Sequence, residues 1–277
     1  MSKITAAEVN KLRKQTGAGM MDCKKALVEA EGDFDKAIEI LRKKGQKVAE
    51  KRSDREANEG VVIAGTNESN DFAAILTLSC ETDFVAKNEE FVGVAKQLLS
   101  IALNERLGSL DELKAANFEN GLSVEEKITE QVGKIGEKIE VSELATVAAD
   151  SAIAYNHPGY KTATILGLNK NSEEVAAAGK NVAMQIAAMN PIAVDVDGVS
   201  EEIKARELEI GREQALKEGK PEQILDKIAQ GKLQKYYKEN TLLNQQYFID
   251  NKQSVGDYLK SIDKELTVTD FKRGSLV

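Results

Sequence analysis

The sequence predicts an α+β protein in which a small helical module precedes two halves built from strands and helices. Apolar residues recur at helical spacing through the first 45 residues, whereas β-rich runs begin near Gly60. The order strand, strand, helix then occurs twice, which indicates two similar halves. We place the module with its linker at 1–54, the first half at 55–148, and the second half, with a helical hairpin at about 200–240, at 149–277.

Three short helices are expected in the module. Thr5 and Glu8 form a capping box at the start of the first helix, and Asp33 is a suitable N-cap for the third. The three helices should end at successive glycines, namely Gly17, Gly32 and Gly45. Each helix carries one narrow apolar stripe, so the three must pack together to hide these stripes from water.

The first half begins with a predicted β-hairpin, whose strands are residues 60–66 and 72–80. Asn88 should cap the helix that follows it. Two further helices should start at capping boxes, formed by Ser109 with Glu112 and by Ser123 with Glu126. A strand is then expected over residues 138–147.

The second half repeats this order, with strands at 152–155 and 161–168 and a helix at 172–189. Residues 201–240 hold nine acidic and nine basic side chains, interrupted by Gly219 and Pro221. A C-terminal glycine and a proline in the first helical position predict two antiparallel helices that project into water. This hairpin could contact a second part of a partner, or form a homodimer with another copy of the chain. A helix at 255–262 and a strand at 266–273 complete the prediction.

The composition excludes several classes of function. A net charge of −8 lacks the basic excess of a nucleic-acid-binding protein. His157 is the only histidine, which leaves no histidine-rich metal site, and no glycine-rich phosphate-binding motif is present. We therefore expect no metal, no cofactor and no direct contact with nucleic acid. No stretch is apolar enough to span a membrane and the first residues lack a signal core, which predicts a cytoplasmic protein with no membrane partner.

Two cysteines, Cys23 and Cys80, lie at apolar positions of the local pattern, which predicts buried, reduced thiols. The basic neighbours Lys24 and Lys25 leave a reactive Cys23 open as an alternative. A thiol enzyme would need a base, and no second cysteine or histidine lies nearby in sequence.

Two segments are long and unusual enough to indicate a family. Residues 16–27 are TGAGMMDCKKAL, and residues 81–88, directly after the strand that ends at Cys80, are ETDFVAKN. The segment KIGE at 134–137 and the pair Tyr155-x-His157 follow in the same order. Together these segments resemble bacterial elongation factor Ts, and the resemblance extends over nearly the whole chain.

The resemblance implies a fold and an activity. The N-terminal module would be a ubiquitin-associated-like three-helix bundle, and the core would consist of two α+β subdomains with a helical hairpin projecting from the second. Members of the family bind elongation factor Tu and accelerate the release of GDP, so that GTP can load. The resemblance therefore implies a guanine-nucleotide exchange factor in translation elongation, with no chemical reaction of its own.

The resemblance assigns Thr82, Asp83, Phe84 and Val85 to the element that dislodges the partner's Mg²⁺. Phe84 would act as a wedge, although the pattern alone favours a core position that anchors the next helix. Asp83 could accept hydrogen bonds from the partner or perturb the Mg²⁺ shell, and it could equally be the N-cap of the next helical turn. Thr82 and Val85 would set the turn and pack beneath the wedge.

Further partner contacts are implied at Met20, Lys24, Ile135, Gly136 and His157. Each has a simpler alternative. Lys24 could be a solvated helix lysine, and one of Met20 and Met21 should fill the core of the module. Gly136 could supply a left-handed turn at a helix end. His157 could be a histidine whose hydrogen bonds are satisfied at the end of a strand.

Two features depart from the family pattern. Many members carry a helical module after the last strand, whereas this chain ends at Val277, soon after Phe271, so we expect the contacts of that module to be missing. Residues 158–161, which follow His157, are PGYK, where the family is richer in glycine and arginine. A rival interpretation is a helical-bundle adaptor without exchange activity, which explains residues 1–45 but gives no role to residues 82–85.

Overall fold

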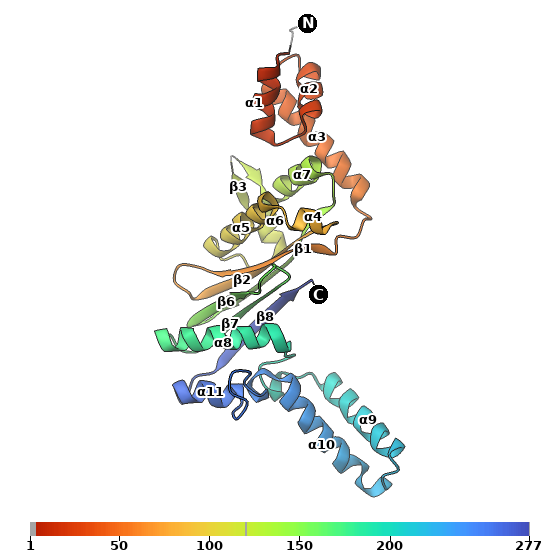
Figure 1. The fold of residues 1–277 in the computed structure, drawn as a ribbon, viewed down its shortest axis with the longest axis vertical. Helices are drawn as coiled ribbons and strands as arrows, with labels where there is room; N and C mark the ends of the chain where they lie inside the picture. The colour runs from red at the N-terminus through yellow and green to blue at the C-terminus, as the bar shows by residue number, and fades with distance from the viewer. Residues whose placement is uncertain (1–3, 120, 277) are drawn as a thin grey trace. The chain divides into compact units, whose positions relative to one another are not determined.

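An all-helical start is followed by alternating strands and helices, as the computed structural model shows for residues 4–119 and 121–276 (Figure 1). This mixture of helix and sheet confirms the predicted α+β class. The chain divides into two compact units, which are described separately. Unit 1 takes up the chain to Ile63, then Leu76–Leu144 and Leu276, and unit 2 takes up Ala64–Ile75 and Ala145–Ser275. The predicted division into three domains stays a prediction.

Unit 1 begins with three helices, α1 (Ala6–Thr16), α2 (Met20–Glu29) and α3 (Phe34–Arg52). The predicted capping box at Thr5 and the predicted N-cap at Asp33 are both confirmed. Because each helix has one apolar stripe, the three stripes meet in a small shared core that excludes water. The buried residues of this core are Val9, Leu12, Cys23, Ala26, Leu27, Ala30 and Ala37.

The third helix does not end at Gly45, so that prediction is wrong. Helix α3 continues to Arg52, and Gly45 is buried where α3 packs on α7 (Val124–Ile135). A Cβ atom added to Gly45 would lie 3.0 Å from the carbonyl oxygen of Thr129, and one added to Gly133 would lie 2.8 Å from the Cα of Gly45. The glycine therefore allows two helix backbones to approach closely, which a sequence pattern cannot distinguish from a helix end.

The first sheet has the strand order β1 (Glu59–Thr66), β2 (Phe72–Cys80), β5 (Ile139–Ala148), and each of these strands has residues in both units. The predicted hairpin and the predicted third strand are confirmed. The central strand β2 is buried along its whole length, as expected for a strand that is covered on both faces.

Four helices and a small ribbon complete unit 1. The predicted caps at Asn88, Ser109 and Ser123 each accept a hydrogen bond from a backbone amide of their helix. The elements besides α7 are α4 (Asp83–Ala86), α5 (Glu89–Asn104), α6 (Leu110–Ala115), β3 (Asn117–Glu119) and β4 (Leu122–Ser123). Strands β3 and β4 were not predicted, because runs this short carry no readable period.

Unit 2 is built on an antiparallel sheet of order β6 (Ser151–Asn156), β7 (Thr162–Leu168), β8 (Val268–Ser275). Helix α8 (Glu173–Met189) lies along this sheet (Figure 1), and its apolar side chains share a core with strands β6 and β7. Helix α11 (Val255–Ile262) contributes to the same core. The predicted strands β6 and β7 and both predicted helices are confirmed to within one residue, and β8 begins and ends two residues later than expected.

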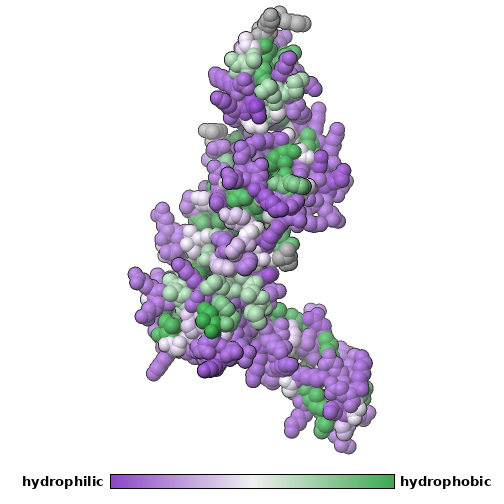
Figure 2. Space-filling model, viewed as in Figure 1, coloured by the Kyte–Doolittle hydropathy of each residue, from purple (hydrophilic) through white to green (hydrophobic). Residues whose placement is uncertain are grey.

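Two long helices of unit 2, α9 (Glu201–Lys217) and α10 (Glu222–Asn240), pack side by side (Figure 1). The predicted break between them is confirmed, but Pro221 is the N-cap of α10 and not its first residue. Their seam contains small residues, since a Cβ atom added to Gly211 would lie 3.1 Å from the Cα of Ala229. Much of their outer surface is hydrophilic (Figure 2), as expected from the charge count. None of the helices in the described part of the chain is long and apolar enough to cross a membrane.

Candidate functional site

An exposed aromatic ring follows the first sheet's central strand. Strand β2 ends at Cys80, and the chain then forms the single helical turn α4 before α5 begins. Phe84, in the middle of this turn, is 84% exposed, the highest value among the exposed large apolar residues of the described chain. The core position that the pattern alone favoured for Phe84 is therefore wrong. An exposed large apolar side chain on a short turn is available to enter a pocket on another molecule.

The carboxylate of Asp83 lies beside this ring in sequence, and it does not cap the turn. The N-cap of α4 is Thr82, and Asp83 is the first helical residue, so the N-cap alternative is wrong. Asp83 Oδ2 lies 2.6 Å from Lys87 Nζ, one turn further on. This partner raises the pKa of Lys87, first through the hydrogen bond and then through the charge of Asp83.

The turn is attached to the segment that follows α7. The backbone amide of Thr82 donates to Glu137 Oε2 at 3.0 Å, and the Thr82 hydroxyl donates to Glu137 Oε1 at 2.6 Å. Gly136 ends α7 with a φ of 82°, the left-handed turn that was the simpler alternative for this residue. The predicted pair Ile135 and Gly136 therefore directly precedes Glu137, the residue that accepts the hydrogen bonds from Thr82.

Glu81 makes a second attachment between the same two segments. Its Oε1 accepts a hydrogen bond from the backbone amide of Lys138 at 2.6 Å. Arg52 Nη1 donates to both carboxylate oxygens of Glu81, at 2.8 Å to Oε1 and 2.9 Å to Oε2. The amide of Lys138, followed by the guanidinium of Arg52, holds the pKa of Glu81 below its ordinary value. Arg52 is the last residue of α3, so the end of that helix is also fixed to the start of the turn.

Met20 and Lys24 lie on helix α2 and are both exposed. The expectation that one of Met20 and Met21 fills the core is wrong, since their exposed fractions are 48% and 62%. Cys23 occupies the buried side of the same helix, as predicted, and Cys80 is also buried, with neither cysteine in a disulfide. Met21, two residues before Cys23, lies on the opposite side of the helix from it, whereas Met20 is exposed as the first residue of the helix.

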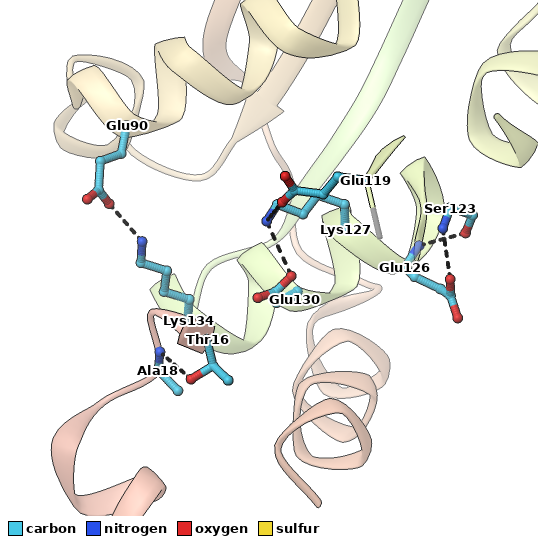
Figure 3. A network of polar contacts seen from close by, with 9 residues as sticks. All are labelled: Thr16, Ala18, Glu90, Glu119, Ser123, Glu126, Lys127, Glu130 and Lys134. Atoms are coloured by element: carbon cyan, nitrogen blue, oxygen red, sulfur yellow. Dashed lines mark hydrogen bonds and ion pairs between the residues drawn. The ribbon is translucent and has the colours of Figure 1, made fainter. Parts of the chain in front are cut away.

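A lysine fixes helix α7 to neighbouring segments of unit 1 (Figure 3). Lys134 Nζ lies 2.7 Å from Glu90 Oε2, and this contact lowers the pKa of Glu90. The same side chain covers Gly17, where an added Cβ atom would lie 3.0 Å from Lys134 Cδ. Lys127 in turn contacts Glu119 and Glu130, each at 3.4 Å. The side chain of Lys134 therefore packs against the end of α1 and forms an ion pair with the start of α5.

His157 belongs to unit 2 and follows strand β6 directly. It is exposed, and its Nδ1 lies 3.1 Å from the hydroxyl of Tyr155, so the ring has a hydrogen-bond partner as the simpler alternative expected. The other predicted site residues all belong to unit 1.

Sequence reasoning missed the residues that hold the turn. Glu81 and Glu137 both stand inside the segments that carried the family resemblance, but neither received a role. Glu81 contacts Lys138 and Glu137 contacts Thr82, and these contacts become visible only when β2 and β5 are paired. Among residues 4–119 and 121–276, no group of three or more histidine, cysteine or acidic side chains is arranged to hold a metal ion.

Comparison with known proteins identifies the family. The model of the family described as "Elongation factor TS" matches residues 81–276. The chain is 55% identical to an elongation factor Ts of Christiangramia forsetii, and the match covers all of both chains. It is 53% identical to one of Amoebophilus asiaticus over 98% of both chains, and 50% identical to one of Flavobacterium psychrophilum over the whole of both. This chain belongs to the elongation factor Ts family.

Proposed function

We propose that the chain is the guanine-nucleotide exchange factor for elongation factor Tu in translation elongation. Membership of the elongation factor Ts family supports the activity, and the exposed ring of Phe84 supports the means. The protein accelerates the dissociation of GDP without making or breaking a covalent bond, and it acts in the cytoplasm. Its first three helices serve as a ubiquitin-associated-like module beside two α+β subdomains.

The mechanism uses binding energy to weaken a nucleotide site on another molecule. GTPases of this type hold GDP through backbone amides, a lysine and a bridging Mg²⁺. A factor that binds best to a conformation in which one of these contacts is poor lowers the affinity for GDP, and GDP lowers the affinity for the factor by the same ratio. Phe84 enters a pocket between elements of the partner and displaces them. Burial of the exposed ring in this pocket lowers the free energy of the complex.

The neighbouring residues have supporting roles in this proposal. Asp83 accepts hydrogen bonds from the partner's backbone or perturbs its Mg²⁺ shell, after exchanging Lys87 for the new contact. Thr82 and Val85 set the conformation of the turn. Further contacts come from the exposed residues of α2, the end of α7 and the end of β6, namely Met20, Lys24, Ile135, Gly136 and His157.

The hairpin of α9 and α10 provides an additional surface. Ile210, Leu216 and Ile224 are exposed on it, with fractions between 39% and 56%. Isolated apolar side chains on a charged helix pair suit a weak contact, either with a second part of the partner or with another copy of the chain. A homodimer through this hairpin therefore remains part of the proposal.

Stopped-flow release of a fluorescent GDP from elongation factor Tu tests the proposal. The wild-type chain should accelerate release, and Phe84→Ala should reduce the maximal stimulated rate by roughly ten-fold or more, in the range of an interface hot spot. Asp83→Ala should give a smaller reduction. Both variants should unfold within about 0.5 kcal/mol of the wild type, because the substituted positions are at the surface.

Phe248→Ala is the matched control, because Phe248 is another exposed phenylalanine, in unit 2 and outside the proposed site. It should leave the stimulated rate unchanged. Wild-type rates for both Phe84→Ala and Asp83→Ala would contradict the wedge, and a wild-type chain that does not accelerate release would contradict the exchange function.

A further inference from the structure

The turn that carries Phe84 is too short to be a stable helix by itself. Helix α4 has four residues, and its N-cap, Thr82, makes no side-chain hydrogen bond to the turn. A single helical turn is unstable in isolation, because fixing its backbone costs more than its few hydrogen bonds return. The ring of Phe84 adds nothing to this stability, since it is 84% exposed. The conformation of the turn must therefore be fixed by contacts outside it.

Glu137 supplies the most direct of these contacts. Its two carboxylate oxygens each take one donor from Thr82, the amide at 3.0 Å and the hydroxyl at 2.6 Å. Hydrogen bonds to an ionised carboxylate are stronger than those between neutral groups, and a bidentate arrangement also fixes orientation. The side chains of both residues are half-buried. The capping oxygen of Thr82 is thus directed to Glu137 and away from the turn.

The backbone on both sides of Glu137 is fixed by a second set of features. Gly136 directs the chain out of α7 with a φ of 82°, and Lys138, on the other side, donates its amide to Glu81 at 2.6 Å. Glu81 and Thr82 are neighbours, so two adjacent residues that lead into the turn are bonded to two adjacent residues after α7. Such a double attachment restricts both the position and the rotation of the segment that leads into Phe84.

Resting on the exchange function proposed above, we infer that Glu137 is a positioning residue for exchange. Through its hydrogen bonds to Thr82 it fixes the conformation of α4, the turn that carries Phe84 and is called the wedge turn below. It does not itself need to touch the partner. Its carboxylate holds the turn in the geometry in which Phe84 enters the partner, so the cost of ordering the turn is met before binding.

The test measures GDP release at saturating concentrations of the chain. Glu137→Ala should reduce the maximal stimulated rate by about ten-fold, which corresponds to about 1.4 kcal/mol. Glu137→Gln should restore most of the rate, because its carbonyl can accept from the Thr82 amide and its NH₂ can donate to the Thr82 hydroxyl. Thr82→Val, which removes only the hydroxyl bond, should give an intermediate loss and serves where Glu137→Ala does not fold.

Glu143→Ala is the matched control. Glu143 accepts a hydrogen bond from Thr77 at 3.1 Å, so this is another glutamate–threonine contact, but it joins residues inside strands β5 and β2 and not residues next to the turn. Its removal should leave the stimulated rate unchanged, whatever it does to unfolding.

Combination with Phe84→Ala separates positioning from general destabilisation. If Glu137 acts through the ring, Glu137→Ala should have no further effect in a chain that already carries Phe84→Ala. Equal losses in both backgrounds would overturn the inference, and so would a wild-type rate for Glu137→Ala. Acceleration by the wild-type chain is measured first, because its absence would refute the exchange function, whereas acceleration without any loss in Glu137→Ala would refute only the positioning role.

Discussion

Two parts of the chain share an order of elements and differ in one connection. Strands β1 and β2 lead to helix α5, and strands β6 and β7 lead to helix α8. In each case the strand before the connection is the central one of its sheet and is buried along its length. The first connection, residues 81–88, has eight residues and contains α4, whereas the second, residues 169–172, has four and contains no helix.

Both connections are tied to the residues that come just before the third strand of their sheet. In the first, Glu81 and Thr82 contact Lys138 and Glu137. In the second, the side chain of Asn169 donates to the Glu265 carbonyl at 2.8 Å and accepts from the Thr267 amide at 2.9 Å. Hydrogen bonds from the connection to the residues before the third strand are therefore common to both halves, and the exposed ring belongs to the additional turn of the first. The two connections therefore share their attachment to the sheet and differ in the extra turn that carries the exposed ring.

The largest effect should come from substitutions in the helices that follow the two connections. A Cβ atom added to Gly179 in α8 would lie 2.7 Å from Ile153 Cγ1, whereas one added to Gly93 in α5 would meet nothing within 4 Å. Gly179→Ala should destabilise the protein by roughly 1–3 kcal/mol through overpacking. Gly93→Ala should stabilise it by roughly 0.4–1 kcal/mol.

Urea unfolding of both variants measures this difference. Stabilisation by both substitutions would show that α8 has no close approach to its sheet. The result would then remove the distinction between the two helices.

A smaller loss of stability is expected when the hydrogen bonds of Asn169 in the second connection are removed. Asn169→Ala leaves the amide of Thr267 and the carbonyl of Glu265 without the partner that they have now, and it should cost roughly 1–2 kcal/mol of unfolding free energy. The maximal rate of GDP release should be unchanged, because the wedge turn lies in the other connection. Asn171→Ala, at an exposed position of the same connection, is the control and should be neutral in both measurements.

The smallest effect concerns pH and is specific to the first connection. The folded protein lowers the pKa of Glu81 from an ordinary value of 4.5, so the ionised carboxylate contributes stability that is complete above pH 4.5. This contribution is lost as the pH falls through the lowered value of the folded state. Glu81→Gln should therefore be less stable than the wild type near neutral pH, and the difference should shrink in acid.

Unfolding measured from pH 7 down to pH 3 tests this sign. A difference between wild type and Glu81→Gln that grows in acid would contradict the role given to the Arg52 and Lys138 contacts. Asn169→Ala provides the comparison, because an amide side chain does not titrate in this range.

Much of the fold follows from local patterns, and the failures have physical causes. Capping boxes identified helix starts at Thr5, Ser109 and Ser123, since a cap is a contact within one turn. The end of α3 was misplaced because Gly45 is required by packing on α7, a contact between residues that are far apart in sequence. Local periodicity holds no information of that kind.

The site was predictable in part, and for a different reason. The resemblance to a known family identified residues 82–85, where pattern alone favoured a buried Phe84. It did not single out Glu137, because the contact of Glu137 with Thr82 depends on pairing β5 beside β2. The expectation that one of Met20 and Met21 fills the core failed because Cys23, Ala26 and Leu27 form the buried side of the short helix α2.

The central claim, that the ring at position 84 enters the partner, can be measured directly. The chain contains no tryptophan, so Phe84→Trp introduces a single probe at an exposed site. The spectrum of the wild-type complex with nucleotide-free elongation factor Tu is subtracted to remove the partner's own emission. The account predicts that the emission of the introduced indole shifts to shorter wavelength on complex formation, because the side chain leaves water for an apolar pocket. An unshifted emission from a Phe84→Trp chain that forms the complex and accelerates GDP release as the wild type does would contradict it.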